Sequence, residues 1–292
     1  MSSHFSCVGF PVDDMDAYWA LARRAAAEGT RLPVQDGSAL IRWAPQNQHP
    51  LTLPSPAGRG ESGWAYPGPQ PTGPEIWAQV SPTGEVIGAT PFFSTGAANA
   101  LAVTGIGEDP EEALDGWIDG WLEPAEPDEP YSGAFPLRVT LLDFALVRSR
   151  ITTFPTTRRV EIAALTHEAE LYENETVYRT APGDTYRLPL DSFASTAHAG
   201  IDNAVDFAEA TALASGRIAQ ARLLINPVSE VPYWWMQVAL RNATLHVFAD
   251  RETLGKEPQA GNILWASFWL VGKMAGPGDQ GTMRPRNQAS KP

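Results

Sequence analysis

Three histidine side chains are the main candidates for binding a metal or transferring protons in this chain: His4, His167 and His198. His167 is followed directly by Glu168, and such a pair could bind a metal or transfer a proton. On a strand, however, neighbouring side chains point to opposite faces, so these two residues cannot share one set of metal ligands. The sequence therefore predicts solvated surface residues at His167-Glu168 and at His198.

The sequence contains none of the short motifs that mark common catalytic sites. It has no HxH, HExxH, CxxC or Gly-x-Ser-x-Gly pattern and no P-loop. Gly105-Ile106-Gly107 lacks the third glycine of a dinucleotide-binding fingerprint. Cys7 lies in an apolar run, which favours an inert core thiol over a nucleophile. The sequence accordingly assigns no catalytic, cofactor-binding or metal-binding residue, and no cofactor.

The composition indicates a folded protein without membrane segments. Hydrophobic residues make up 43% of the 292 residues and ten are tryptophans, so sizeable cores are available. A single cysteine excludes an intramolecular disulfide and fits a reducing cytoplasm. No signal peptide is visible, and the longest apolar run, 263–271, is about half of what a membrane span needs. These features predict a cytoplasmic protein.

The net charge of −13 is concentrated in one stretch. Residues 108–130 contain ten acidic side chains and no lysine or arginine, so they supply −10 of that charge. An acidic surface repels phosphate backbones, which makes nucleic acid an unfavourable partner.

The first 122 residues read as one α+β domain of βαβββ type. A helix starting at Asp13, its N-cap, and ending near Gly29 follows a first strand over 4–12. Asp109-Pro110-Glu111-Glu112 has the form of a second helix start, and an apolar stripe continues to residue 122. Three further strands are expected at 39–43, 75–80 and 85–93, the last two joined by a Ser81–Gly84 turn.

A proline- and glycine-rich insertion over 45–74 interrupts the hairpin formed by strands 39–43 and 75–80. Such a composition has too few regularly spaced apolar residues to bury, so the sequence predicts disorder there. Passive insertion is the favoured interpretation. The alternative is a lid that would use Trp64 and Tyr66.

An acidic, proline-rich linker over 123–134 leads to a β-rich, barrel-like domain over 135–274. A helix is expected at 203–214, and a disordered tail at 275–292. The expected strands of this domain lie at 137–147, 159–172, 221–225, 233–240, 243–249 and 263–271.

The element order over residues 4–93 resembles one half-module of the vicinal oxygen chelate (glyoxalase-like) superfamily. That resemblance implies a divalent metal held by a histidine on the first strand and a glutamate on the fourth. His4 matches the first of these positions. The expected fourth strand, 85–93, has no acidic residue near its end, so no second ligand is assigned.

Residues 221–272 resemble the end of an OB-like β-barrel, chiefly through Gly261–Gly272. That resemblance implies nucleic-acid binding on aromatic platforms beside a cationic groove. Residues 135–275 hold thirteen basic and fifteen acidic side chains, which weakens such a groove. The platform residues would be Tyr233, Trp234, Trp235, Trp265, Phe268 and Trp269, with a basic patch at Arg148, Arg150, Arg158 and Arg159.

Residues 49–61 resemble peptides translated from intergenic palindromic repeats found within bacterial genes, a resemblance that supports passive insertion and implies no activity. From these patterns we expect a noncatalytic binding or interaction protein with a protein or small-molecule partner. The alternatives are a glyoxalase-like metal-dependent enzyme that uses His4, and an OB-like nucleic-acid-binding module.

Overall fold

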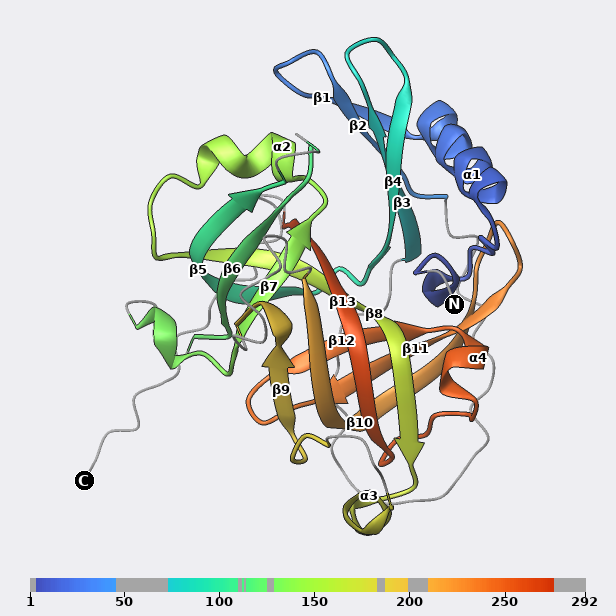
Figure 1. Cartoon of the computed structure of the whole chain (residues 1–292), viewed down its shortest axis with the longest axis vertical. Helices are drawn as coiled ribbons and strands as arrows, with labels where there is room; N and C mark the ends of the chain where they lie inside the picture. Colours follow the sequence, from blue (N-terminus) through green and yellow to red (C-terminus); the bar gives the residue numbers. More distant parts are fainter. Residues whose placement is uncertain are drawn as a thin grey trace, which may run out of the picture.

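The computed structural model describes residues 4–45, 73–109, 112, 114–124, 129–182, 187–198 and 210–275. The protein is α+β and mostly strand, with a four-stranded sheet near the N-terminus and a nine-stranded sheet built from the rest of the chain (Figure 1). The predicted fold class and the β-rich C-terminal region are thereby confirmed. The expected disorder at 45–74 and at 275–292 falls almost entirely on residues outside the described ranges.

The first sheet has the strand order β1-β2-β3-β4 and packs against helix α1 (Met15–Glu28). Asp14 caps this helix by accepting a hydrogen bond from the backbone N–H of Ala17 at 2.8 Å, and Gly29 ends it. The predicted helix is confirmed, with its cap one residue later than expected. The strands are β1 (Thr30–Pro33), β2 (Ala39–Trp43), β3 (Gly73–Val80) and β4 (Val86–Ser94).

The hairpin predicted across the insertion is present. Strands β2 and β3 are antiparallel, with Trp43 opposite Ile76. Strands β3 and β4 are joined by the expected tight turn, where the N–H of Gly84 donates to the carbonyl of Ser81 at 3.0 Å and Gly84 has a φ of 90°.

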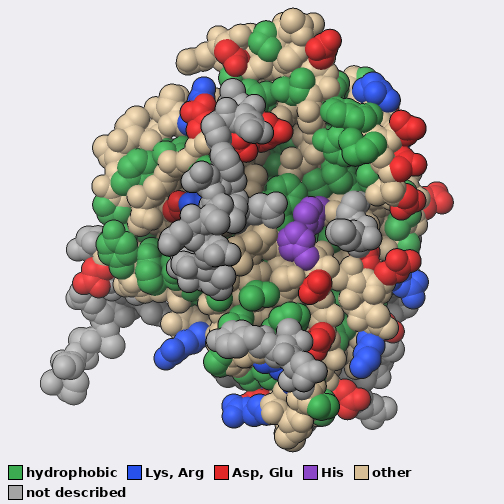
Figure 2. Space-filling model, in the orientation of Figure 1, with side chains coloured by type: hydrophobic (Ala, Val, Ile, Leu, Met, Phe, Trp, Pro, Cys, Tyr) green, Lys and Arg blue, Asp and Glu red, His purple; other side chains and the backbone are tan. Residues whose placement is uncertain are grey.

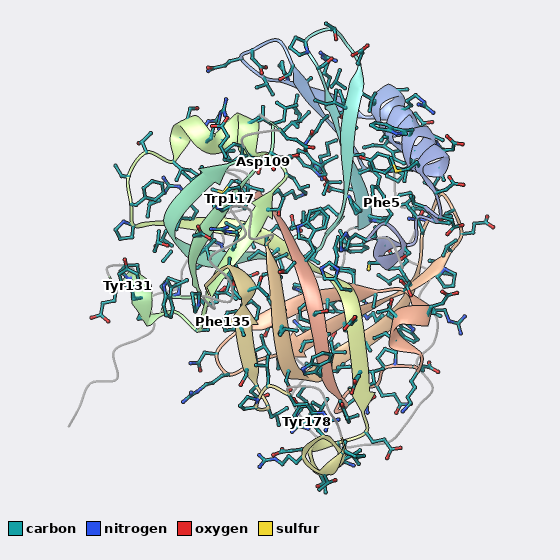
Figure 3. The ribbon with its side chains drawn as sticks, viewed as in Figure 1. Phe5, Asp109, Trp117, Tyr131, Phe135 and Tyr178 are labelled. Carbon is teal, nitrogen blue, oxygen red and sulfur yellow. The ribbon has the colours of Figure 1, made fainter. Side chains whose placement is uncertain are left out.

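The strand predicted at 4–12 is wrong. Residues Ser6–Val8 form a 3-10 helix, η1, and Gly9 turns the chain with a φ of 78°. The N–H of Phe10 bonds back to the carbonyl of Phe5 at 2.9 Å, which an extended strand could not do. The apolar run is buried on all sides rather than on alternate faces, and periodicity alone cannot separate these cases. Phe5, labelled in Figure 3, meets the Tyr18 ring edge-on at 5.6 Å.

The strands of the second sheet close into two rings that share β8 (Thr156–Tyr172) and β13 (Ile263–Met274). One ring continues from β8 through β5, β6 and β7 to β13. The other continues from β8 through β12, β11 and β10 to β13. The remaining strands are β5 (Ala98–Glu108), β6 (Gly116–Leu122), β7 (Pro136–Leu141), β9 (Ser192–Ser195), β10 (Thr211–Ile225), β11 (Pro232–Ala239) and β12 (Thr244–Ala249).

The helix predicted from Asp109 to residue 122 is wrong, because residues Gly116–Leu122 are strand β6. Burial alternates along it, with Ile118 and Leu122 buried and Trp117 and Trp121 half-exposed. Gly116 and Gly120 disfavour a helix by about 1 kcal/mol each, and tryptophan and isoleucine favour strands. The spacing of the apolar residues fits both a helix and a strand, so only the two glycines indicated that this segment is a strand.

The sheet pairings bear on two other expectations. Strands β6 and β7, on either side of the expected linker at 123–134, are hydrogen-bonded to each other, and the break between the two sheets lies at 95–97. The division into two domains at 123–134 stays a prediction. In the helix predicted at 203–214, residues from Thr211 onward belong to β10, and 203–209 lie outside the described part of the chain. Short helices α2 (Phe144–Val147), α3 (Glu175–Thr180) and α4 (Arg251–Leu254) complete the fold.

Beside a small cluster of Tyr172, Tyr178, Ile263 and Trp265, two large hydrophobic cores hold the described part of the molecule together. One runs through both rings, from Leu101 in the first to Met236 in the second. The other lies between the first sheet and the outer face of the second ring, where Phe93 stacks on Phe248 with ring centres 4.6 Å apart. The first sheet is therefore docked on the rings through an apolar interface, and a cavity opens along one side of it.

Candidate functional site

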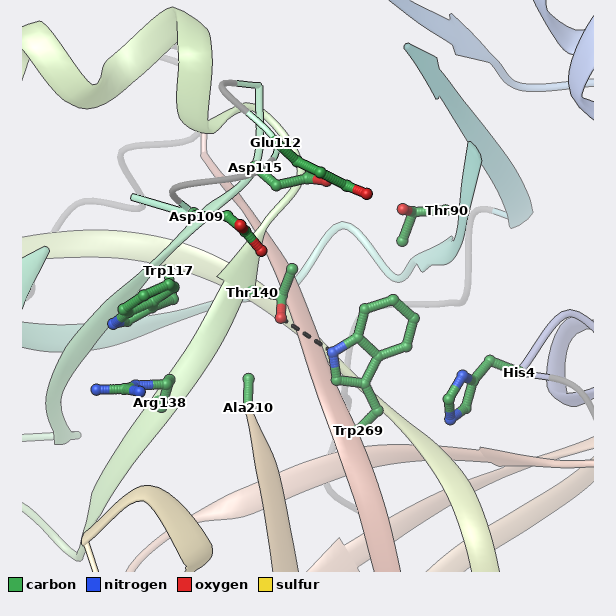
Figure 4. A pocket seen from close by; sticks show the side chains of 11 residues that line it. His4, Thr90, Asp109, Glu112, Asp115, Trp117, Arg138, Thr140, Ala210 and Trp269 are labelled. Carbon is green, nitrogen blue, oxygen red and sulfur yellow. Dashed lines mark hydrogen bonds between the residues drawn. The ribbon is translucent and has the colours of Figure 1, made fainter. Parts of the chain in front are cut away.

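The cavity has a volume of about 380 Å³ and lies where the first sheet meets the β5–β7 ring (Figure 4). Its walls come from segments far apart in the sequence: Thr90 on β4, the loop before β6, Arg138 and Thr140 on β7, and Trp269 on β13. Figure 2 shows histidine side chains, in purple, reaching the surface within a hollow of this face. Several elements must dock correctly before this site exists.

Three acidic side chains of the β5–β6 loop line the cavity: Asp109, Glu112 and Asp115. The loop is closed on itself, since the N–H of Asp109 donates to the carbonyl of Asp115 at 3.1 Å. The N–H of Asp115 in turn donates to the carbonyl of Glu112 at 2.8 Å. These backbone bonds hold the three carboxyl groups on one short, tight segment.

Asp115 is the most perturbed of these acids. Burial raises the pKa of its carboxyl group, and the hydrogen bond and negative charge of Glu112 raise it further. The amide of Gln79, a buried side chain on β3, donates to Asp115 and opposes this shift only in part. The carboxyl groups of Asp115 and Glu112 thus sit too close together to be ionised without cost.

A tryptophan forms the wall on the side away from the acidic loop. The indole Nε1 of Trp269 donates to Oγ1 of Thr140 at 2.9 Å, which fixes the ring (Figure 4). The imidazole of His4 packs against the same indole, with ring centres 4.8 Å apart. Because its polar atom is satisfied within the protein, the indole can offer its face to a ligand.

A second tryptophan, Trp117, is held between a glycine and an arginine. Its ring lies so close to Gly107 on β5 that an added Cβ would be 2.2 Å from it. The guanidinium of Arg138 is 4.7 Å from the ring centre. Asp119 accepts two bonds from Arg138, at 2.8 and 3.0 Å, so the positive charge of Arg138 is largely offset. Asp109 and Trp117 are labelled in Figure 3.

The structure brings together two of the histidines considered from the sequence. His4 Nε2 lies 3.0 Å from His167 Nδ1. Burial and the neighbouring His167 lower the pKa of His4 to about 4. Within the described ranges, no group of three or more His, Cys, Asp or Glu residues could hold a metal ion. The metal site implied at His4 stays a prediction, and the side chain paired with His4 is a histidine rather than a glutamate.

Other residues considered from the sequence lie away from the cavity lining. Cys7 is buried, its thiol donates to the carbonyl of Thr166 at 3.3 Å, and burial raises its pKa to about 12. These are the properties of an inert thiol. Glu168 is exposed, and His198 follows the edge strand β9.

Most of the aromatic side chains expected to form a nucleic-acid platform are buried. Tyr233, Trp234, Trp235 and Phe268 belong to the two large cores, and Trp265 belongs to the smaller cluster. Of the six, only Trp269 lines the cavity. The basic patch is partly neutralised, since Arg148 forms an ion pair with Glu108.

Sequence reasoning missed the roles of Asp115, Arg138, Thr140 and Trp269. The density of acids at 108–130 was an available signal, but it was used only to argue against nucleic acid as a partner, and Asp109-Pro110-Glu111-Glu112 was interpreted as a helix start. No family model, no curated protein and no solved structure matches this chain. Among the described residues, no helix is long and apolar enough to cross a membrane.

Proposed function

We propose that this protein is a noncatalytic binding protein whose ligand is an organic cation held in the cavity beside the β5–β6 loop. The observation that carries the proposal is the convergence of Asp109, Glu112 and Asp115 on a cavity whose far wall is the Trp269 indole. Among the described residues of the lining, Arg138 is the one cationic side chain, and Asp119 offsets its charge. The cavity is therefore negatively charged.

A bound cation would remove the unfavourable contact between the carboxyl groups of Asp115 and Glu112. An opposite charge within a few ångströms stabilises an ionised carboxylate. An indole face attracts a cation through its ring quadrupole, with about 0.5–2 kcal/mol for a partly desolvated pair. Carboxylates on one side and an indole on the other thus match a ligand with a positive head and a flat or apolar body.

A guanidinium is the cation that best fits this setting. The chain itself holds one nearby: the Arg138 guanidinium lies over the Trp117 ring and is bound by both carboxylate oxygens of Asp119. The cavity offers the same kinds of group, carboxylates on the β5–β6 loop and the Trp269 indole. A planar fork pairs with carboxylates more specifically than a compact ammonium does. The ligand is therefore either a small guanidinium compound or an arginine side chain of a partner protein.

Five of the six aromatic side chains expected to stack nucleic-acid bases are buried, so binding of an organic cation is favoured over nucleic-acid binding. Stacking needs exposed aromatic faces along a cationic groove. The cavity has acidic walls instead. Salt-sensitive retention on a nucleic-acid column would favour the nucleic-acid alternative, and elution at low salt would remove it.

Isothermal titration calorimetry with matched ligands tests the proposal. Butylguanidinium and butylammonium should both bind, the first more tightly, whereas neutral butylurea, which has nearly the same shape, should bind at least about tenfold more weakly. Asp115→Asn and Trp269→Leu should each weaken binding of butylguanidinium. Glu168→Gln, a charge removal on an exposed part of β8, serves as the control and should leave it unchanged. Equal affinity for the urea, or no binding of either cation, would overturn the proposal.

A further inference from the structure

The pair formed by His4 and His167 plays no part in the proposed function, although His4 lines the same cavity. The two residues are 163 positions apart in the sequence, and the docking of the N-terminal segment against β8 brings them together. Nε2 of His4 and Nδ1 of His167 are 3.0 Å apart. The rings are nearly perpendicular, at 75°, and their centres are 4.5 Å apart.

These distances differ from those of two imidazoles that meet head-on. In a head-on contact the ring centres are separated by the nitrogen–nitrogen distance plus both ring radii, which is clearly more than 4.5 Å when the nitrogens are 3.0 Å apart. The rings are therefore inclined to each other. The contact is a hydrogen bond whose donor and acceptor depend on the tautomers, so one of the two nitrogens carries a hydrogen. If that hydrogen moves to the other nitrogen of its ring, a metal ion can take its place, at a position in front of both nitrogens.

A metal ion at such a position would have two cis nitrogen ligands. With metal–nitrogen distances of about 2.05 Å, a nitrogen separation of 3.0 Å corresponds to a ligand–metal–ligand angle of roughly 95°. A tetrahedral ion would instead require the nitrogens to be about 3.3 Å apart. An angle near a right angle suits square-planar, tetragonal and octahedral ions, which among biological metals points to Cu²⁺ and Ni²⁺.

We propose that His4 and His167 form a two-imidazole site for Cu²⁺ or Ni²⁺, with water in the remaining coordination positions. His4 is already oriented for this role by its packing against the Trp269 indole, with ring centres 4.8 Å apart. Because His4 lines the cavity, solvent can reach the metal from that side. Since no third protein ligand is close within the described ranges, the ion should be exchangeable and open to an external ligand.

This site is independent of the cation-binding proposal. His4 lies beyond the Trp269 ring from the three acids, so the indole separates the two positions (Figure 4). If guanidinium compounds do not bind, the metal-site proposal still stands, and if Cu²⁺ does not bind, the cation-binding proposal still stands.

The test uses the full-length protein freed of metal with a chelator. Cu²⁺, Ni²⁺ and Zn²⁺, each added alone, should bind in that order of decreasing affinity, with one Cu²⁺ per chain. Cu²⁺ should quench the tryptophan fluorescence, because it would lie beside Trp269. Electron paramagnetic resonance of the Cu²⁺ form should show coupling to two imidazole nitrogens.

Variants separate this pair from other copper-binding groups of the chain. His167→Gln leaves His4 and every residue before it in place, and it should weaken Cu²⁺ binding by roughly tenfold or more, since even outer-shell changes cost this much. His4→Gln should do the same, and His198→Gln is the matched control that should not. Melting curves recorded in chelator confirm that each variant is folded.

Unchanged Cu²⁺ affinity in His167→Gln would overturn the proposal. So would coupling to a single imidazole nitrogen, or Zn²⁺ binding more tightly than both other ions.

Discussion

The ionised carboxyl group of Asp115 is expected to lower the stability of the folded protein and to favour binding of a cationic ligand. Burial and the charge of Glu112 raise its pKa in the folded protein above the value of an ordinary aspartate. The folded state therefore retains a proton over a pH range in which the unfolded chain has already lost it. Stability must fall as the pH rises through that range. A cationic ligand would offset this loss.

Asp115→Asn should stabilise the protein while weakening cation binding. The asparagine removes an ionised group from a poorly solvated position and can still accept the bond from Gln79. We expect a gain of about 1 kcal/mol in the free energy of unfolding near pH 8, shrinking toward zero near pH 4. Denaturant titrations at several pH values measure this difference. The exposed Asp13→Asn should show no comparable trend. A variant less stable than the wild type at pH 8 would contradict the prediction.

Gly107 should be needed to position Trp117. In Gly107→Ala the new methyl group would lie 2.2 Å from the indole, so the ring must move. We expect a loss of about 1–3 kcal/mol and a change in tryptophan emission. Gly105→Ala is a matched control on the same strand, because the nearest atom to its new methyl group would be 3.8 Å away. Equal effects of the two substitutions would show that the contact with Trp117 is not the cause.

At the scale of elements, a buried set of charges joins the first sheet to the shared strands of the rings. Glu75 on β3 is 1% exposed and accepts bonds from Arg42, from Trp77 at 2.9 Å and from Lys273 at 3.1 Å. Lys273 on β13 also lies 3.4 Å from Glu161 on β8. Burial alone would raise the pKa of Glu75, but the hydrogen bond from Arg42 and the charge of Lys273 hold it below its usual value.

Breaking this set should loosen the docking of the first sheet. Glu75→Gln should cost about 3 kcal/mol, because it leaves buried positive charge incompletely paired. Glu75→Gln combined with Lys273→Met should cost less than the sum of the two single substitutions, by on the order of 1–3 kcal/mol. A double-mutant cycle in urea measures this coupling. Strict additivity would mean that the two residues do not depend on each other.

The same carboxylate gives a pH dependence opposite to that of Asp115. Since the pKa of Glu75 is lower in the folded than in the unfolded state, its stabilisation is complete above the ordinary glutamate pKa. It is lost as the pH falls through the lower, folded value. Glu75→Gln should therefore flatten the acid side of the stability profile.

At the scale of the whole molecule, the two rings share β8 and β13 and the first sheet docks across them. The β2–β3 hairpin is complete on either side of the insertion, with Trp43 opposite Ile76. Long loops cost little: closing about thirty residues rather than four costs about 2 kcal/mol. The insertion is therefore expected to be dispensable for folding.

Replacing residues 46–72 with a short Gly-Asn turn should leave the melting temperature equal or higher, because loop-closure entropy is recovered and the strand pairs are retained. Differential scanning calorimetry of the two proteins provides the comparison. A clear fall in melting temperature would show that the segment contributes packing, as a lid that uses Trp64 and Tyr66 would.

The sequence by itself determined the elements whose signals are local. The position of α1 to within one residue, its stop at Gly29, the Ser81–Gly84 turn and the β2–β3 hairpin all arise from neighbouring residues, so they could be predicted. Hydrophobic periodicity gave the wrong type of secondary structure where the spacing of a short apolar run was compatible with more than one type. Within the expected strand at 4–12, residues Ser6–Val8 form a 3-10 helix, and within the expected helix from Asp109 to residue 122, residues Gly116–Leu122 form a strand.

Only the tertiary structure decided the site. Ring closure through β8 and β13, the meeting of His4 with His167 and the placement of Asp115 opposite Trp269 each depend on strand pairing between distant segments. Local propensity carries no information on such pairings. They are selected by which arrangement buries both hydrophobic cores while satisfying the polar groups between them.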